Sequence, residues 1–166
     1  IQLLNGPAFK DRGAASDEYI TAFKNLWTEE SPSFEGTHVN YSGLKFFPKP
    51  VQYPHPPLWI GGEARLARQR AAKFGDGWYP VGNNPRAPFD TAERYGQGLR
   101  EVHENAELIG RSTSDITAGL LAIWYKLVTS DKTNTGARRA FTGSSKEILG
   151  DVEAYREKGL QCLIIG

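Results

Sequence analysis

The pattern that most constrains the fold of this chain is an alternation of short apolar segments with amphipathic stretches, which begins at residue 58. Each apolar segment is followed by a stretch whose apolar residues recur at helical spacing. Strands that alternate with helices predict right-handed parallel βαβ units. The expected strands are 58–60, 77–81, 116–128 and 160–165, and the expected helices are 63–74, 89–108 and the segment between Ser144 and Gly159.

The last of these helices has the clearest signals. Ser144 and Glu147 have the spacing of a capping box, and Gly159 supplies a natural stop. The residues expected to face the core are Ile148, Leu149, Val152 and Tyr155 here, and Leu99, Val102, Ala106 and Ile109 in the preceding helix.

Parallel βαβ units build either an open doubly wound sheet or a closed (β/α)8 TIM barrel. A whole barrel needs about 250 residues, so this chain of 166 residues has room for about four strand–helix units. Methionine is absent and the sequence ends in an apolar strand, a pattern that indicates the C-terminal half of a longer protein. We therefore expect residues 1–166 to form a single, incomplete (β/α) barrel domain of the α/β class.

The region before residue 58 has a different pattern. Residues 17–28 have helical spacing, and 34–47 consist of short alternating stretches broken by glycine, which predict a hairpin. Five prolines between residues 48 and 57 then exclude a regular helix or a central strand.

Composition excludes several classes of function. The formal charge of +1 gives no electrostatic reason to expect nucleic acid or an anionic membrane as a partner. No apolar run approaches the roughly 18 residues of a membrane span. The single cysteine, Cys162, excludes a disulfide framework, and the three histidines lack metal-ligand spacing, so we expect no metal site.

The carboxyl ends of parallel strands are where such folds bind ligands. Gly61, Gly62, Glu63 and Ala64 join a strand end to a helix start, where free N–H groups and the helix dipole favour a phosphate. Glu63 argues against an anion unless its side chain points away, and an ordinary tight βα turn explains the two glycines equally well.

Three other features have a structural and a functional interpretation each. Trp78 and Tyr79 would either stack on a flat ring system or pack in the core. The loop 129–142 would be a binding lid or a solvated basic loop, and Arg65 and Arg68 would reach an anionic ligand or face water. Cys162 is expected to be a buried, inert thiol. Because no catalytic constellation is present, an enzyme of this sequence would depend on a cofactor.

The order and spacing of several short motifs resemble the bacterial luciferase-like family of flavin- and deazaflavin-dependent oxidoreductases. The resemblance is dense from about residue 11 to residue 80 and looser beyond. The motifs are Glu18-Tyr19-Ile20, Asn25-Leu26-Trp27-Thr28-Glu29, Ser33-Phe34-Glu35-Gly36, Pro48-Lys49-Pro50-Val51-Gln52, Pro57-Leu58-Trp59-Ile60-Gly61-Gly62 and Gly75-Asp76-Gly77-Trp78.

The resemblance implies a (β/α)8 barrel in which this chain begins after the fourth strand and 30–57 is an insertion before the fifth. It places the cofactor phosphate near Gly61 and Gly62, with Glu63 and Ala64, and puts Gly75, Asp76, Gly77 and Trp78 beside it. The residues of the motifs Trp59-Ile60-Gly61-Gly62 and Gly75-Asp76-Gly77-Trp78 are more similar to the branch that uses coenzyme F420 than to the branch that uses FMN. The family's catalytic residues lie in earlier strands, so no catalytic residue is assigned.

The leading hypothesis is thus a cytoplasmic enzyme that transfers hydride between F420 and a small organic substrate. An FMN-dependent monooxygenase served by a flavin reductase is the alternative within the family. From other classes, the chain would be a non-catalytic half-barrel that forms a homodimer or larger oligomer, or a truncated product without function.

Overall fold

The computed structural model describes residues 6–166, and the chain divides into two compact units, Ile1–Pro57 and Leu58–Gly166. The boundary coincides with the start of the first expected strand–helix unit.

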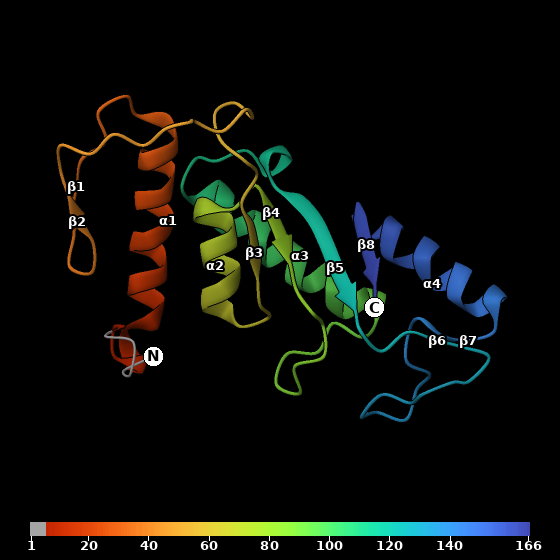
Figure 1. Cartoon of the computed structure of the whole chain (residues 1–166). Coiled ribbons are helices and arrows are strands. Elements are labelled where there is room, and N and C mark those ends of the chain that lie inside the picture. Colours follow the sequence, from red (N-terminus) through yellow and green to blue (C-terminus); the bar gives the residue numbers. More distant parts are fainter. Residues whose placement is uncertain (1–5) are drawn as a thin grey trace. The chain divides into compact units, whose positions relative to one another are not determined.

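The first unit contains one long helix and a short hairpin (Figure 1). A 3-10 turn, η2 (Phe9–Asp11), leads into helix α1 (Arg12–Thr28), which begins five residues before the expected start. Strands β1 (Phe34–Glu35) and β2 (Asn40–Tyr41) pair antiparallel, which confirms the expected hairpin. Residues 42–57 contain neither helix nor strand, in agreement with their prolines.

Glu18 of α1 fixes the hairpin turn. Its carboxylate accepts hydrogen bonds from the backbone N–H groups of Thr37, His38 and Val39 at 3.0, 2.6 and 2.6 Å. Desolvation acts to raise the pKa of Glu18, but these three bonds outweigh it and lower the pKa. A second anchor is Lys49, whose Nζ donates to the carbonyls of Leu26 and Glu29, each at 2.6 Å.

The second unit is built on a four-stranded parallel sheet in the order β3-β4-β5-β8. Its strands are β3 (Trp59–Gly61), β4 (Gly77–Tyr79), β5 (Thr117–Ala122) and β8 (Cys162–Ile165). The strand expected at 116–128 ends early because the chain turns after Ala122 and buries Trp124, whose indole donates to the Ala140 carbonyl. The returning segments form a small parallel pair, β6 (Lys126–Leu127) with β7 (Thr142–Gly143).

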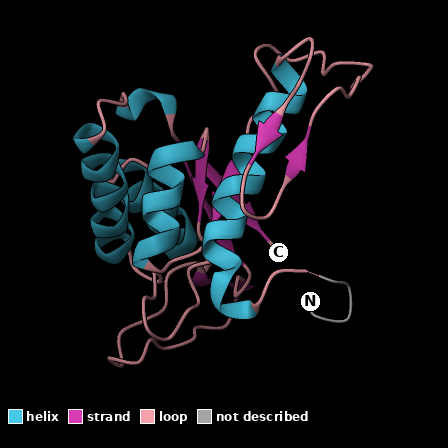
Figure 2. Ribbon diagram, turned by 90° about the vertical axis from the view of Figure 1, so that its left-hand side faces the viewer, coloured by secondary structure: helices cyan, strands magenta, loops and turns pink. Residues whose placement is uncertain are grey.

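Three helices pack on one face of this sheet (Figure 1, Figure 2). They are α2 (Arg65–Phe74), α3 (Ala92–Leu108) and α4 (Ser145–Glu157), with a 3-10 turn, η3 (Thr113–Asp115), before β5. The capping box of Ser144 and Glu147 is present as expected. Most of the residues expected to face the core on α3 and α4 do so. Leu149 and Ile109 are the exceptions, because they remain 60% and 56% exposed.

Side chains of the strands alternate between the helix-covered face and an open face. Trp78 and Leu120 point to the helices and are fully buried, whereas Trp59 and Tyr79 lie on the other face with their rings 5.9 Å apart. A Cβ on Gly77 or Gly119 would come within 2.7 Å of the Trp59 ring. The glycines therefore make room for this indole on the open face.

Candidate functional site

All four strands run parallel, so their carboxyl ends lie at one edge of the sheet (Figure 1). The last strand residues are Gly61, Tyr79, Ala122 and Ile165. The segment 62–64 follows the first of them and leads directly into α2. It lies where the sequence predicts a phosphate site.

The glycine turn has a backbone that only glycine adopts without strain. Gly62 has a φ of +107°, and a Cβ there would lie 2.9 Å from the Cβ of Ala67. Ala64 precedes α2 without a side-chain cap. Within residues 6–166, neither the Glu63 nor the Ala64 N–H donates a hydrogen bond. The turn thus presents two free donors at the positive end of a ten-residue helix.

The carbonyls of Gly62 and Glu63 both accept hydrogen bonds from side chains of the protein interior. The indole Nε1 of Trp78 donates to the Gly62 carbonyl at 3.1 Å, and Nη1 of Arg68 donates to the Glu63 carbonyl. The Arg68 side chain is only 12% exposed, and its Nη2 forms an ion pair of 2.5 Å with Oε2 of Glu101 on α3. The turn is therefore fixed to both α2 and α3.

The Glu63 side chain points to the neighbouring loop. Its Oε1 accepts a hydrogen bond from the Gly82 N–H at 2.8 Å, and Gly82 itself is buried with a φ of +79°. The carboxylate thus bridges the segments that follow β3 and β4. It leaves the Glu63 and Ala64 N–H groups unbonded.

The second glycine motif lies elsewhere. Gly75 and Asp76 precede β4, so they lie at the amino ends of the strands, and the expectation that this turn is beside the first is wrong. Asp76 has a structural role there: its Oδ2 accepts from the Leu58 N–H at 2.7 Å, and its carbonyl accepts from the Thr117 N–H at 2.9 Å. Helix α2 separates the two glycine motifs because each βα unit returns the chain to the opposite edge of the sheet.

Trp78 belongs to the core. Its side chain is 0% exposed, stacks on Tyr95 at 5.6 Å and meets Phe89 edge-on at 5.3 Å. A buried ring cannot stack on a ligand, so its connection to the turn is the hydrogen bond to Gly62. Tyr79, on the open face, is only partly buried.

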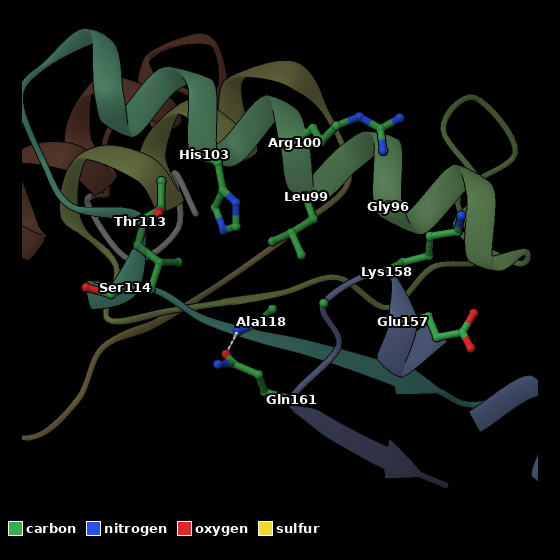
Figure 3. A pocket seen from close by; sticks show the side chains of 12 residues that line it. Gly96, Leu99, Arg100, His103, Thr113, Ser114, Ala118, Glu157, Lys158 and Gln161 are labelled. Atoms are coloured by element: carbon green, nitrogen blue, oxygen red, sulfur yellow. Dashed lines mark hydrogen bonds between the residues drawn. The ribbon is translucent and has the colours of Figure 1, made fainter. Parts of the chain in front are cut away.

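A hollow of about 460 Å³ in the second unit lies away from this turn (Figure 3). It is lined by α3, η3 and the residues that lead into β5 and β8, so it lies near the amino ends of these strands. His103 points into it, and burial lowers the pKa of this imidazole despite the nearby Glu107. None of the residues predicted for cofactor binding lines it.

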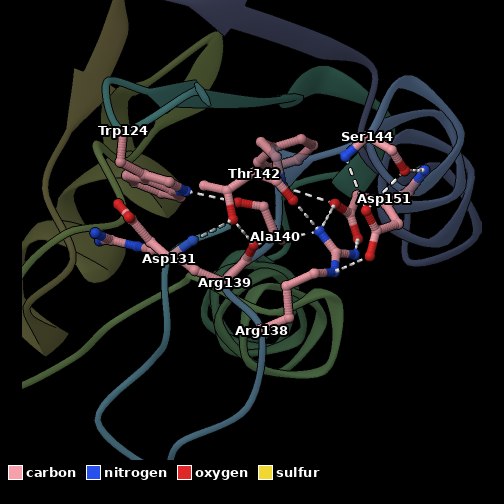
Figure 4. Close-up of polar contacts among 10 residues, drawn as sticks. Trp124, Asp131, Arg138, Arg139, Ala140, Thr142, Ser144 and Asp151 are labelled. Atoms are coloured by element: carbon pink, nitrogen blue, oxygen red, sulfur yellow. Dashed lines mark hydrogen bonds and ion pairs between the residues drawn. The ribbon is translucent and has the colours of Figure 1, made fainter. Parts of the chain in front are cut away.

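The loop 129–142 is held in place rather than free (Figure 4). Arg138 forms two bonds to the Asp151 carboxylate, at 2.5 and 2.9 Å, and donates to the Thr142 carbonyl at 2.5 Å. The hydrogen bond to Asp151 raises the pKa of Arg138. Arg139 lies over the Trp124 ring at 4.3 Å. Both arginines of this basic loop thus bind other side chains of the second unit and do not simply face water.

No helix between residues 6 and 166 has the length and apolar character to cross a bilayer. Over the same residues, no three His, Cys, Asp or Glu side chains are arranged to bind a metal ion.

Comparison with protein families gives one match over nearly the whole chain: the model of the luciferase-like monooxygenases matches residues 1–159. One similar protein is an FMNH2-dependent dimethylsulfone monooxygenase of Pseudomonas putida, 32% identical over 119 residues. The alignment covers 68% of this chain and 32% of the relative, so the chain spans about a third of that protein.

Solved structures agree on the fold. An F420-dependent secondary alcohol dehydrogenase in complex with an F420–acetone adduct superposes with a TM-score of 0.71 at 15% identity, over 96% of this chain and 57% of the other. A long-chain alkane monooxygenase superposes with a TM-score of 0.70 at 11% identity, over 96% and 52%. The dehydrogenase and the monooxygenase superpose almost equally well, so these likenesses show the fold and do not distinguish the reaction.

Proposed function

This chain belongs to the luciferase-like monooxygenase family, and we propose that it supplies the phosphate-binding half of a reduced-flavin-dependent oxidoreductase whose barrel it forms in part. The proposed cofactor residues are Gly61, Gly62, Glu63 and Ala64. Gly75, Asp76 and Gly77 are left out because they lie at the amino ends of the strands. Trp78 is buried and does not contact the cofactor in this proposal, but its indole fixes the Gly62 carbonyl by a hydrogen bond.

The observation that carries the proposal is the pair of unbonded donors, the Glu63 and Ala64 N–H groups, in front of α2. A phosphate that approaches there meets two N–H groups and the positive end of a helix. The absence of a Cβ at Gly62 allows close approach to the backbone. These features suit the phosphate of FMN and that of F420 alike.

The chain's own contribution is binding and orientation. By holding the phosphate at the carboxyl edge, the turn would direct the rest of the cofactor along the face that carries Trp59 and Tyr79. A bound flavin supplies oxygen activation for monooxygenation, whereas a deazaflavin supplies hydride transfer. A small organic substrate is proposed because the relative at 32% identity is named for dimethylsulfone.

Reduced FMN is the first candidate. Its support is the relative at 32% identity, which is named for FMNH2, while the neighbour named for F420 is only 15% identical. With FMN, the reaction would be monooxygenation and a flavin reductase would be the partner. F420 is the second candidate because the motifs Trp59-Ile60-Gly61-Gly62 and Gly75-Asp76-Gly77-Trp78 favour it. The homodimer and the cytoplasmic location stay predictions.

Equilibrium titration with FMN and, separately, with F420, followed by cofactor fluorescence, tests the proposal. Saturable binding of either would support it, and the tighter of the two would identify the reaction class. Binding of neither would contradict it and favour the non-catalytic half-barrel.

A further inference from the structure

The geometry points to Arg68 as the positioning residue of the phosphate turn, a role that rests on the proposed function. Arg68 lies behind the turn and is bonded to its backbone, so it would act through the Glu63–Ala64 peptide and touch no phosphate oxygen. In this arrangement, one buried guanidinium determines which way an anion-binding N–H points.

In a planar trans peptide, the carbonyl oxygen and the following N–H point in opposite directions. Nη1 of Arg68 holds the Glu63 carbonyl towards the interior, so the Ala64 N–H must face outward. The Trp78 indole does the same for the Gly62 carbonyl and the Glu63 N–H. The Glu63 and Ala64 N–H groups are therefore free because the Trp78 indole and the Arg68 guanidinium hold the two preceding carbonyls.

The shape of the arginine side chain matters. Nη1 reaches the Glu63 carbonyl while Nη2 reaches Glu101, so one planar group connects the turn to α3. A lysine has no second, rigidly placed nitrogen and would satisfy only one partner at a time. Glu101 balances the charge, with Nη2 and Oε2 at 2.5 Å, and itself remains about one-third exposed.

The surroundings of the guanidinium support a fixed position. The Arg68 side chain is 12% exposed, its centre lies 6.0 Å from the Phe89 ring, and its Nε has no hydrogen-bond partner. A cation with so little freedom is suited to orienting a backbone group. Arg65, in contrast, is exposed at the first position of the same helix.

Two substitutions at Arg68 separate the positioning role from a general loss of structure. Arg68→Met removes both bonds but keeps most of the stem, and Arg68→Lys keeps the charge. The readout is the ratio of affinities for FMN and riboflavin, which lacks the phosphate. We expect Arg68→Met to weaken FMN binding about tenfold, as expected for the loss of one well-aligned hydrogen bond from a backbone N–H to the phosphate, with riboflavin binding unchanged. Arg68→Lys should recover part of the loss.

Two controls accompany them. Glu101→Gln removes the ion pair but not the bond from Arg68 to Glu63, so it should leave the FMN-to-riboflavin ratio within about twofold. Arg100→Met removes an exposed arginine of α3 that is bonded to Gln97, and it should change neither affinity. Circular dichroism establishes that each variant is folded.

The backbone amide of Ala64 gives a second readout that needs no cofactor. Arg68→Met should shift its proton resonance and should reduce the further shift caused by inorganic phosphate. An unchanged Ala64 resonance, or equal loss of FMN and riboflavin binding, would overturn the inference. If the unsubstituted protein binds FMN no better than riboflavin and does not bind F420, the proposed function fails, and the Ala64 resonance alone then decides the role of Arg68.

Discussion

The Oε1 atom of Glu63 lies 2.8 Å from the backbone nitrogen of Gly82, so a carboxylate bridges the segments that follow β3 and β4. The same residue contributes one of the two free N–H groups of the proposed phosphate turn. A negative side chain next to an anion site weakens that site by repulsion. The Glu63 carboxylate therefore stabilises the segment after β4 through Gly82, but its charge lowers the affinity of the turn for phosphate.

Glu63→Gln should strengthen FMN binding about fivefold, equivalent to about 1 kcal/mol of relieved repulsion at a half-exposed position. The amide oxygen of glutamine can still accept the bond from Gly82, so the loop should keep its conformation. Riboflavin affinity serves as the control and should not change. Weaker FMN binding by the folded variant would show that the carboxylate assists the cofactor instead.

Gly62→Val should weaken both folding and FMN binding. The substitution forces a branched side chain to a φ of +107°, with its Cβ 2.9 Å from that of Ala67, and costs at least about 1–2 kcal/mol. The matched control is Gly110→Ala, because Gly110 also has a positive φ but has open space around it. Fluorescence titration of the two variants should show reduced FMN affinity for Gly62→Val alone. If the two variants bind FMN with equal affinity, the phosphate does not bind at this turn.

Trp78→Ala should lower the free energy of unfolding by about 3–5 kcal/mol, as expected for removal of a fully buried aromatic side chain. Trp78→Phe keeps much of the packing but leaves the Gly62 carbonyl without its donor, at a cost of about 1–3 kcal/mol. Urea unfolding measures both. Loss of flavin binding without loss of stability would support the stacking interpretation instead.

Acid should destabilise the first unit through Glu18. Because the folded state lowers the pKa of this carboxylate, its contribution to stability is present above the unfolded pKa and is lost as the pH falls through the folded one. Glu18→Gln should remove this pH dependence. The amide resonances of Thr37 and Val39, which donate to the carboxylate, report the transition. An identical acid transition in both proteins would assign the effect to another group.

The sequence predicts the architecture well because its strongest signals are local. Ser144 and Glu147 form the expected capping box, and the four expected strands make one parallel sheet. Strand ends are less predictable: β5 stops at Ala122 because Trp124 is drawn into the core, and that depends on packing with the distant Phe141.

The candidate site is only partly readable from the sequence. The Gly61-Gly62 pair marks the turn, but the partners that fix it, Arg68 and Trp78, give no local signal for this role. The expectation that Gly75 and Asp76 lie beside the turn rests on the family resemblance and not on the pattern of strands and helices. The course of α2 carries them to the opposite edge, which the alternation of strands and helices itself requires.

The most direct test of the account is the difference in affinity between FMN and riboflavin, measured by fluorescence titration of the unsubstituted protein. The two compounds share a ring and differ by the phosphate alone. If the turn from Gly61 to Ala64 holds the phosphate, FMN should bind at least about tenfold more tightly, since its contacts are charge-assisted. Equal affinities, together with no binding of F420, would contradict the account and leave Gly61 and Gly62 as an ordinary βα turn.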